Sequence, residues 1–297
     1  MAENPKGPGP KSGTLHKYLP LKGDNGMLPD PTATSQQFIR GLLAAVAPTE
    51  WVTAWARSPV YHTRKQRGWE ATRGDHTETA LAVATWMHDQ NCLGRDAYFG
   101  PATFASDPTA SGGRGKADEA SRVLTAVIDL DRKWFSSDQE CLEAVEKLRE
   151  VWEPAAVVET SKGGFHVHYQ ANHPGDLSNP DDLERQKNNQ RHILSGARAV
   201  VGADLDATLD LVRVFRVPGT RHMTKGFVAK LHSTAVELPD DPYLDQIGLE
   251  FASHIPKHIT ERPELVQGAE VVRASDTIDL KGYTVQQVTA KLMEGEW

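Results

Sequence analysis

The chain has 297 residues, of which 39% are hydrophobic and 25% charged, and its formal net charge is −7. A chain of this length can bury the core of one large domain or two smaller ones, and no apolar run reaches the length of a membrane span. Only Cys92 and Cys141 are present, so neither a disulfide framework nor a cysteine-rich zinc site is expected. The N-terminus shows no signal-peptide pattern, and we expect a cytoplasmic protein.

The negative charge is concentrated toward the C-terminus. Twelve acids and five Lys or Arg follow residue 236, so the first 236 residues are neutral overall. This neutral part contains two basic stretches. One is Leu211–Val236, which has no acid, and the other comprises Arg57, Arg64, Lys65 and Arg67 beside Trp69. Local patches of this kind decide whether a phosphate backbone can dock, although an ordinary solvated face gives the same pattern.

Residues 1–33 are rich in Pro and Gly and predict a disordered leader. After them, hydrophobic spacing and capping residues predict helices and strands in alternation. In order, these are a helix from Ser35 ended by Pro48, a strand over Trp51–Arg57, a helix over His76–Asn91 capped by Asp75 with the apolar stripe Ala80, Leu81, Ala84 and Met87, and a strand over Ala97–Phe104 kinked at Gly100-Pro101.

The second half continues the mixture of helices and strands. The predicted elements are a strand over Val123–Asp131, a helix over Asp138–Val151, a strand over Ala155–Glu159, a returning strand over Phe165–Gln170, a helix from Asn179 or Asp181 to about Val200, strands over Leu211–Val217 and Phe227–Leu238, a helix from Asp240 or Asp241 to about Phe251, and a short helix near Thr284–Met293. Because hairpins are frequent among them, the pattern predicts an α+β fold with a largely antiparallel sheet.

The strand ending in Asp129-Leu130-Asp131 is the first candidate site. Side chains alternate along a strand, so Asp129 and Asp131 share one face and lie about 6.6 Å apart. Two such carboxylates can converge on divalent cations of the kind used in phosphoryl and nucleotidyl transfer. A buried strand that ends in a solvated acidic turn has the same sequence pattern.

Two further stretches carry candidate residues. After the turn Ser161-Lys162-Gly163-Gly164, a strand places His166 and His168 on one face, where they could bind a metal or donate to a phosphate, although a single strand histidine is more often structural. The stretch Gly202–Thr220 carries Asp204, Asp206 and Asp210 before Arg213 and Arg216. A third carboxylate could complete a metal site here, and the planar arginine guanidinium suits phosphate.

Taken together, the order of these motifs resembles the archaeo-eukaryotic primase superfamily, in particular its plasmid and phage primase-polymerases. The matching pieces are Asp129-Leu130-Asp131, Gly164-Phe165-His166, and Asp206 followed by Arg213-Val214-Phe215-Arg216-Val217-Pro218-Gly219-Thr220. The strand over Ala97–Phe104 and the Arg114-Gly115-Lys116 loop also look like the family's approach to its first motif. The resemblance covers roughly Gln37 to Leu238, and three motifs in order are more specific than any one of them.

This resemblance implies a fold and an activity. It implies a catalytic domain over residues 34–251, in which an RRM-like antiparallel sheet carries the motifs beside an N-terminal α/β subdomain, followed by an acidic tail over residues 252–297. It implies template-directed nucleotidyl transfer, which makes or extends primers on single-stranded DNA from ribo- or deoxynucleoside triphosphates. A plasmid or phage setting, a helicase partner and no membrane are also implied.

The resemblance also assigns roles to residues. Asp129, Asp131 and Asp206 would bind two Mg²⁺ or Mn²⁺ ions, and His166 would hold the triphosphate. Supporting nucleotide contacts would come from Arg114, Lys116, Ser161, Lys162, Arg213, Arg216 and Lys225, and DNA contacts from Arg64, Lys65, Arg67 and Arg221.

The chain departs from the family pattern in two places. His222 and Thr224 stand where the family often has Asn and Lys, so the role of Lys225 is open. The third carboxylate is either Asp206 or Asp204, and the spacing to Arg213 favours Asp206.

Two other functions use parts of the same pattern. His166-Val167-His168 resembles the His-hydrophobic-His triplet of rolling-circle replication nucleases, but Tyr243 and Tyr283 lack the helical neighbours expected of their nucleophile, and Asp129 and Asp131 would have no role. DxD-dependent glycosyl transfer leaves the Pro218-Gly219-Thr220 turn unexplained. A non-catalytic DNA-binding initiator module remains an alternative if Asp129 and Asp131 bind no metal.

Overall fold

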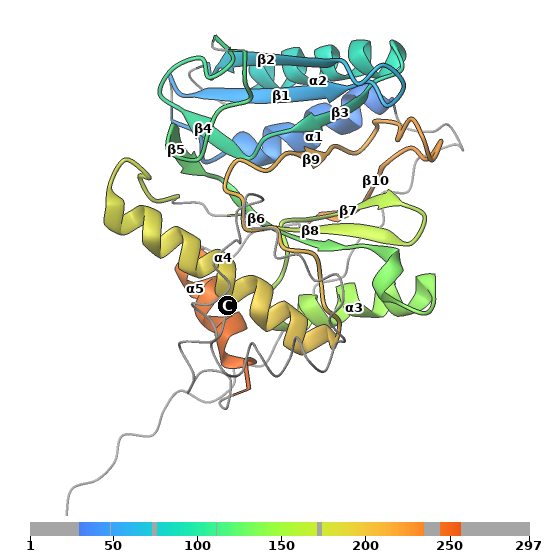
Figure 1. Ribbon diagram of the computed structural model, residues 1–297, viewed down its shortest axis with the longest axis vertical. Coiled ribbons are helices and arrows are strands. Elements are labelled where there is room, and N and C mark those ends of the chain that lie inside the picture. The colour runs from blue at the N-terminus through green and yellow to red at the C-terminus, as the bar shows by residue number, and fades with distance from the viewer. Residues whose placement is uncertain are drawn as a thin grey trace, which may run out of the picture. The chain divides into compact units, whose positions relative to one another are not determined.

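The computed structural model describes residues 30–47, 49–72, 76–110, 112–170, 174–234 and 244–256. This part of the chain is an α+β fold with two antiparallel sheets, which confirms the predicted fold class (Figure 1). The helices are α1 (Pro31–Leu43), α2 (Thr77–Cys92), α3 (Asp138–Val151), α4 (Pro180–Val201) and α5 (Leu244–Ser253). None of these helices is long and apolar enough to cross a membrane.

The first sheet has the strand order β5-β4-β1-β3-β9, and β2 also pairs with β1, along its whole length. Its strands are β1 (Trp51–Arg57), β2 (Arg64–Glu70), β3 (Asp96–Phe99), β4 (Ala102–Phe104), β5 (Ala120–Val123) and β9 (Phe215–Arg216). The single strand predicted over Ala97–Phe104 is therefore two strands, because the Gly100-Pro101 pair interrupts the ladder and proline has no N–H to donate.

Helix α1 begins four residues earlier than predicted, because Asp30 caps it by accepting a hydrogen bond from the Thr32 N–H and Pro31 occupies the first turn. Phe38, Ile39, Leu42 and Leu43 of α1 join α2 in one core that includes residues of both sheets. The predicted α2 stripe is wrong at Leu81, which is 47% exposed, and Val83 is buried in its place. Trp69 is also buried, and it packs edge-on against Trp86 with a centroid separation of 5.7 Å.

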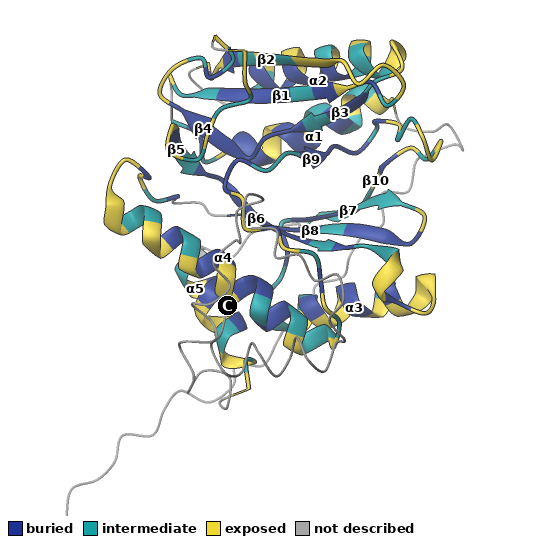
Figure 2. Ribbon diagram, in the orientation of Figure 1, coloured by how far each residue is buried: buried dark blue, intermediate teal, exposed yellow. Residues whose placement is uncertain are grey.

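The second sheet has the order β10-β7-β8-β6. Its strands are β6 (Thr125–Leu130), β7 (Ala156–Ser161), β8 (Gly164–Gln170) and β10 (Lys230–Thr234). Residues that alternate along β6 and β8, such as Ile128 and Val167, face a second core formed with α3, α4 and α5 (Figure 2). The other face of β6 and β8 carries the predicted site residues and is turned away from these three helices.

Helix α1 also holds the Pro218-Gly219-Thr220 turn in place. The Ser35 hydroxyl donates to the Pro218 carbonyl at 2.6 Å, and a Cβ at Gly219 would lie 2.4 Å from the Pro31 carbonyl oxygen. Gly219 also has φ +89°, a conformation that disfavours other residues. The turn therefore requires glycine twice, once for its backbone conformation and once for the close approach of α1.

The remaining differences from the predictions lie in the second half. The strand predicted over Leu211–Val217 is reduced to Phe215–Arg216. The strand predicted over Phe227–Leu238 begins later, at Lys230, and residues 235–238 lie outside the described residues. The leader up to residue 29, the caps Asp75, Asp240 and Asp241, and the helix over residues 284–293 lie outside the described residues.

Candidate active site

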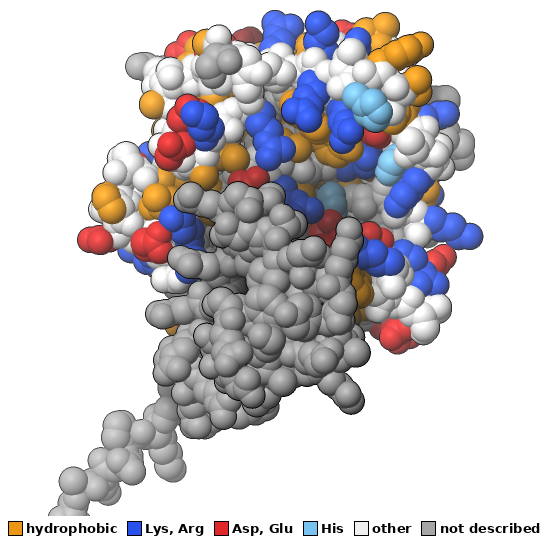
Figure 3. Space-filling view, in the orientation of Figure 1, with side chains coloured by type: hydrophobic (Ala, Val, Ile, Leu, Met, Phe, Trp, Pro, Cys, Tyr) orange, Lys and Arg blue, Asp and Glu red, His pale blue; other side chains and the backbone are white. Residues whose placement is uncertain are grey.

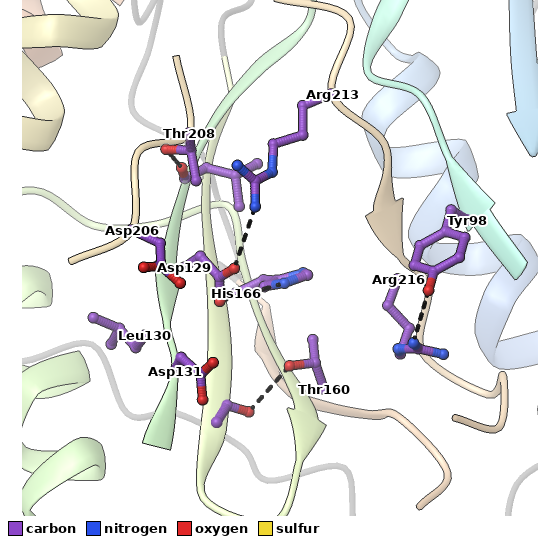
Figure 4. Close-up of polar contacts among 12 residues, drawn as sticks. Tyr98, Asp129, Leu130, Asp131, Thr160, His166, Asp206, Thr208, Arg213 and Arg216 are labelled. Carbon is purple, nitrogen blue, oxygen red and sulfur yellow. Dashed lines mark hydrogen bonds and ion pairs between the residues drawn. The ribbon is translucent and has the colours of Figure 1, made fainter. Parts of the chain in front are cut away.

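Asp129 and His166 are held opposite each other by the pairing of β6 with β8. The His166 Nε2 lies 3.7 Å from the Asp129 Oδ1, which is beyond hydrogen-bonding distance (Figure 4). Their side chains are 12% and 22% exposed, so both keep a path to solvent. The strand register thus places one acid and one imidazole side by side at the partly open end of β6.

Asp131 lies just beyond this strand and not within it. The predicted strand over Val123–Asp131 is interrupted at Leu124, whose N–H donates to the Pro101 carbonyl, and β6 ends at Leu130. Asp131 instead caps a short 3₁₀ helix over Arg132–Trp134 by accepting from the Lys133 N–H at 3.3 Å. Its backbone remains extended, and its carboxylate lies near that of Asp129 in Figure 4.

The third carboxylate comes from the loop after α4. Asp206 reaches the site, where it forms a 2.6 Å ion pair with Lys133, whereas Asp204 is 80% exposed and pairs with Arg198 at 3.4 Å. The loop is fixed to the middle of β6 because the Thr208 hydroxyl donates to the Val127 carbonyl at 2.7 Å. Sequence spacing did not reveal this anchor, since a threonine in a loop gives no pattern.

Lys133 is a member of the site that the sequence analysis missed. Its ammonium lies 2.6 Å from the Asp206 Oδ2 and 3.6 Å from the Asp131 Oδ2, and these contacts raise its pKa, the hydrogen bond to Asp206 most of all. As the side chains stand, no group of three or more His, Cys, Asp or Glu in the described part of the chain is close enough to hold a metal ion. Lys133 supplies the positive charge among the acids.

These residues fit a divalent cation in their chemistry. Carboxylate oxygens are the donors that Mg²⁺ and Mn²⁺ prefer, and two of the three acids already share one cationic partner. The pKa of Asp129 is raised to about 6, mainly by burial and also by the nearby Asp131 and Asp206 charges, against the opposing effect of Arg213. Because burial and the neighbouring acids disfavour the charged form of Asp129, additional positive charge would stabilise its carboxylate.

His166 is neutral at physiological pH. Burial lowers its pKa to about 3, and the positive charges of Arg216 and Arg213 act in the same direction. Its Nδ1 is buried and has no hydrogen-bond partner among the described residues. The ring can therefore offer an N–H donor to a ligand but not a charge.

The two arginines of the third motif point to different places. Arg213 lies 3.8 Å from the Asp129 carboxylate and donates to the Ala207 carbonyl at 2.6 Å. Arg216 is 5% exposed, forms a 2.9 Å ion pair with Asp96 and donates to the Tyr98 hydroxyl at 3.1 Å (Figure 4). Arg213 is thus beside the acids, whereas Arg216 belongs to a buried ion pair of the first sheet.

His168 shares the strand face of His166 but not its surroundings. It is 1% exposed and lies edge-on to Phe38 and Phe215, with centroid separations of 5.2 and 5.9 Å. Burial lowers its pKa well below the usual value. The second histidine of the His-hydrophobic-His triplet therefore lies in an apolar pocket that Phe38 and Phe215 also line. The candidate nucleophiles of a rolling-circle nuclease, Tyr243 and Tyr283, lie outside the described residues.

The other predicted nucleotide-binding residues are spread over several loops. Arg114 pairs with Asp210 at 3.2 Å and so joins its loop to the segment that carries Asp206. Lys116 is 76% exposed and lies 3.8 Å from Glu119. Three more lie at turns: Ser161 at the end of β7, Lys162 in the β7–β8 turn, and Lys225 in the turn over 223–225.

The predicted DNA-binding residues also lie at the surface. Arg64, Lys65 and Arg67 are exposed along the edge strand β2. Arg221 is exposed and forms an isolated bridge with Val228.

No protein-family model and no curated protein matches the chain. The solved structures that are similar to it include the following three. The crystal structure of primase RepB' has a TM-score of 0.48 at 16% identity and covers 82% of this chain and 69% of its own. The catalytic domain of primase RepB' in complex with initiator DNA has a TM-score of 0.47 at 16% identity, covering 80% and 100%. The AEP domain of the cyanophage S-2L primase-polymerase has a TM-score of 0.47 at 17% identity, covering 75% and 97%.

Proposed function

We propose that the chain is a primase-polymerase: a metal-dependent nucleotidyltransferase that makes or extends primers on single-stranded DNA. The observation that carries the proposal is the meeting of three carboxylates from two distant segments. Asp129 and Asp131 come from the end of β6, and Asp206 comes from the loop after α4. Two of them share the Lys133 ammonium, and the third lies beside His166 and Arg213.

In this proposal the three carboxylates hold Mg²⁺ or Mn²⁺. When bound, the cations lower the charge cost of a 3′-hydroxyl attacking the α-phosphate of a nucleoside triphosphate and of pyrophosphate leaving. The neutral His166 donates an N–H to a triphosphate oxygen, and Arg213 adds positive charge on the same side. No covalent intermediate with the protein is needed, because the primer hydroxyl is itself the nucleophile.

Lys133 has a separate part in the proposal. Three acids this close repel one another, and the Lys133 ammonium offsets the repulsion between Asp131 and Asp206 until cations bind. Its side chain is 50% exposed and flexible, so it can leave the acids for solvent or for a substrate phosphate without disturbing the core.

The wider setting follows from the motif resemblance. We propose single-stranded DNA as template, ribo- or deoxynucleoside triphosphates as substrates, and plasmid or phage replication as the context, with a helicase as a partner. Among the predicted nucleotide-binding cations, Lys116, Lys162 and Lys225 are exposed and Arg114 is half-buried, and these four are proposed to support the nucleotide.

Primer extension on a labelled primer–template with Mn²⁺ or Mg²⁺ tests the proposal. Replacing both Asp129 and Asp131 by Asn should reduce extension by about 100-fold or more, because several kcal/mol of charge stabilisation is lost. Asp206→Asn should have a similar effect. Asp204→Asn is the matched control from the same loop, and it should extend at the wild-type rate because Asp204 is 80% exposed and paired with Arg198.

Two outcomes would contradict the proposal. Extension at the wild-type rate by the Asp129→Asn, Asp131→Asn protein would remove the metal site. Binding of single-stranded DNA by the wild type without any extension, under both metals and both nucleotide types, would identify a non-catalytic initiator module.

A further inference from the structure

The face of the first sheet that is turned away from α2 carries a row of flat side chains. Trp55 of β1 is paired with Tyr98 of β3, and Tyr98 is paired with Arg216 of β9. The Trp55 and Tyr98 rings are 5.5 Å apart between centroids, and the Arg216 guanidinium lies 5.0 Å from the Tyr98 centroid. Both aromatic side chains are only partly buried. The row runs across three strands and leaves aromatic surface accessible to a ligand.

Positive charge borders this row at the β1–β2 hairpin. Arg57 and Arg64 are exposed, lie directly opposite each other in the register, and share the sheet face of Trp55. Like charges in this position repel, so the pair favours an anion beside it. Asp96, which lies opposite Arg57 on the other side, is 7% exposed and bound to Arg216, so it does not neutralise the pair.

The hairpin also ends in exposed apolar side chains. Val60 and Tyr61 are 72% and 79% exposed, and the Ser58 hydroxyl accepts a hydrogen bond from the Tyr61 N–H at 3.1 Å. In Figure 3, Lys and Arg side chains gather beside hydrophobic ones over the sheet that contains β1 and β3. Exposed aromatic groups alternating with cations are typical of surfaces that bind unpaired bases and their phosphates together.

We propose that this face binds a single strand of nucleic acid. Bases stack on Trp55 and Tyr98, with Tyr61 as a further contact at the tip, and phosphates pair with Arg57 and Arg64. A single strand fits better than a duplex, because bases in a duplex are already stacked on one another and cannot cover the rings. Charge complementarity and partly exposed aromatic rings select this occupant over a protein partner.

The location connects this face to the candidate active site. Arg216 ends the row on β9, and the adjacent Phe215 packs edge-on against His166 with a centroid separation of 5.4 Å. Phe215 and Arg216 lie on opposite faces of β9, the end strand of this sheet, so a strand lying on the row reaches the site of His166 and Asp129 by passing over this edge. This inference extends the proposed function by naming where the template lies, and it can be tested without catalysis.

The test is the binding of fluorescein-labelled oligo(dT) to the full chain. Binding is measured by fluorescence anisotropy in a buffer that contains EDTA and no nucleotides. Trp55→Leu should raise the Kd roughly 5- to 100-fold, since a stacking contact is lost, and Trp55→Phe should recover most of the affinity. The Arg57→Gln, Arg64→Gln protein should flatten the slope of log K against log salt by about 1.4, or about 0.7 for each lost phosphate contact. Circular dichroism checks that each variant is folded.

A charge-matched control is available on the other sheet's helices. Lys147 of α3 and Arg191 of α4 are exposed, and replacing both by Gln should leave the affinity and the salt slope unchanged. Affinities within twofold of wild type for the Trp55→Leu and Arg57→Gln, Arg64→Gln proteins would overturn the proposal, and so would tighter binding of a duplex. The Asp129→Asn, Asp131→Asn protein should still bind oligo(dT), so loss of catalysis and loss of this surface are told apart.

Discussion

Replacing Asp129 with Asn should stabilise the protein at neutral pH. The Asp129 carboxyl has a pKa near 6 in the folded protein, raised from 3.8 by burial and by two neighbouring acids. Between these two values the folded protein binds more protons than the unfolded chain, so rising pH costs stability, and the penalty is fully present above about pH 6. An Asn of the same shape carries no charge and avoids this penalty.

The shift sets the size of the effect. At about 1.4 kcal/mol per pKa unit, a rise of roughly two units corresponds to at most about 3 kcal/mol in the free energy of unfolding. Asp129→Asn also loses the attraction between Asp129 and Arg213, which are 3.8 Å apart. This attraction lowers the pKa of Asp129, so the value of about 6 already includes it and the figure of about 3 kcal/mol needs no further correction. In a domain of this size, each kcal/mol corresponds to about 2–4 °C in Tm.

Urea unfolding of wild type and Asp129→Asn at a series of pH values from 4 to 8, in EDTA, measures the difference. We expect nearly equal free energies of unfolding at pH 4 and a growing advantage for Asp129→Asn up to about pH 7. Asp204→Asn is the control, and it should differ from wild type by less than about 1 kcal/mol, because the Asp204 side chain is 80% exposed. An Asp129→Asn protein that is less stable than wild type at pH 7.5, or whose advantage is independent of pH, would refute this account of the acid cluster.

Two further predictions concern Asp96 and His166. Asp96→Asn leaves the Arg216 guanidinium, 6% exposed, without its countercharge and should cost about 3–5 kcal/mol in urea unfolding, whereas Asp138→Asn, which breaks the more exposed pair with Arg132, should cost under about 1 kcal/mol. Equal costs for the two would contradict the buried pair. His166→Gln keeps an N–H donor and should retain more primer extension than His166→Leu, by about tenfold in kcat/KM, because the neutral ring acts as a donor. Equal activity of the two variants would exclude this role.

The elements with strong periodicity were predictable from the sequence. The helix α3 has its predicted bounds, because Cys141, Val145 and Leu148 recur at helical spacing and Ser137 caps the first turn. The β7–β8 hairpin was also predictable, since the glycines 163 and 164 stand between two apolar strands. In the structure Gly163 has φ +69° in this turn.

The elements that were missed lack such signals. Strand β2 has charged or polar side chains on both faces, so Arg64–Glu70 shows no alternation, and its place comes from pairing with all of β1. The end of β6 was predicted one residue too late, because the capping role of Asp131 depends on the turn that follows it.

The candidate site was predictable in its acids but not in its cation. The motif order indicated Asp129, Asp131 and Asp206, and the fold brings all three to one end of β6. Lys133 was missed because its partner Asp206 is 73 residues away, in a loop whose course is fixed by Thr208. Contacts between distant loops are determined by the packing of the elements that carry them, and a single sequence carries no record of that packing.

The central claim is that Asp129, Asp131 and Asp206 bind divalent cations, and its most direct test is Mn²⁺ binding. Electron paramagnetic resonance measures this binding as the loss of the free-ion signal. The account predicts that wild type and Asp204→Asn bind Mn²⁺ with the same affinity, and that Asp206→Asn and the Asp129→Asn, Asp131→Asn protein bind at least about tenfold more weakly, as expected when a carboxylate ligand is removed. Equal Mn²⁺ affinity in all four proteins would contradict it.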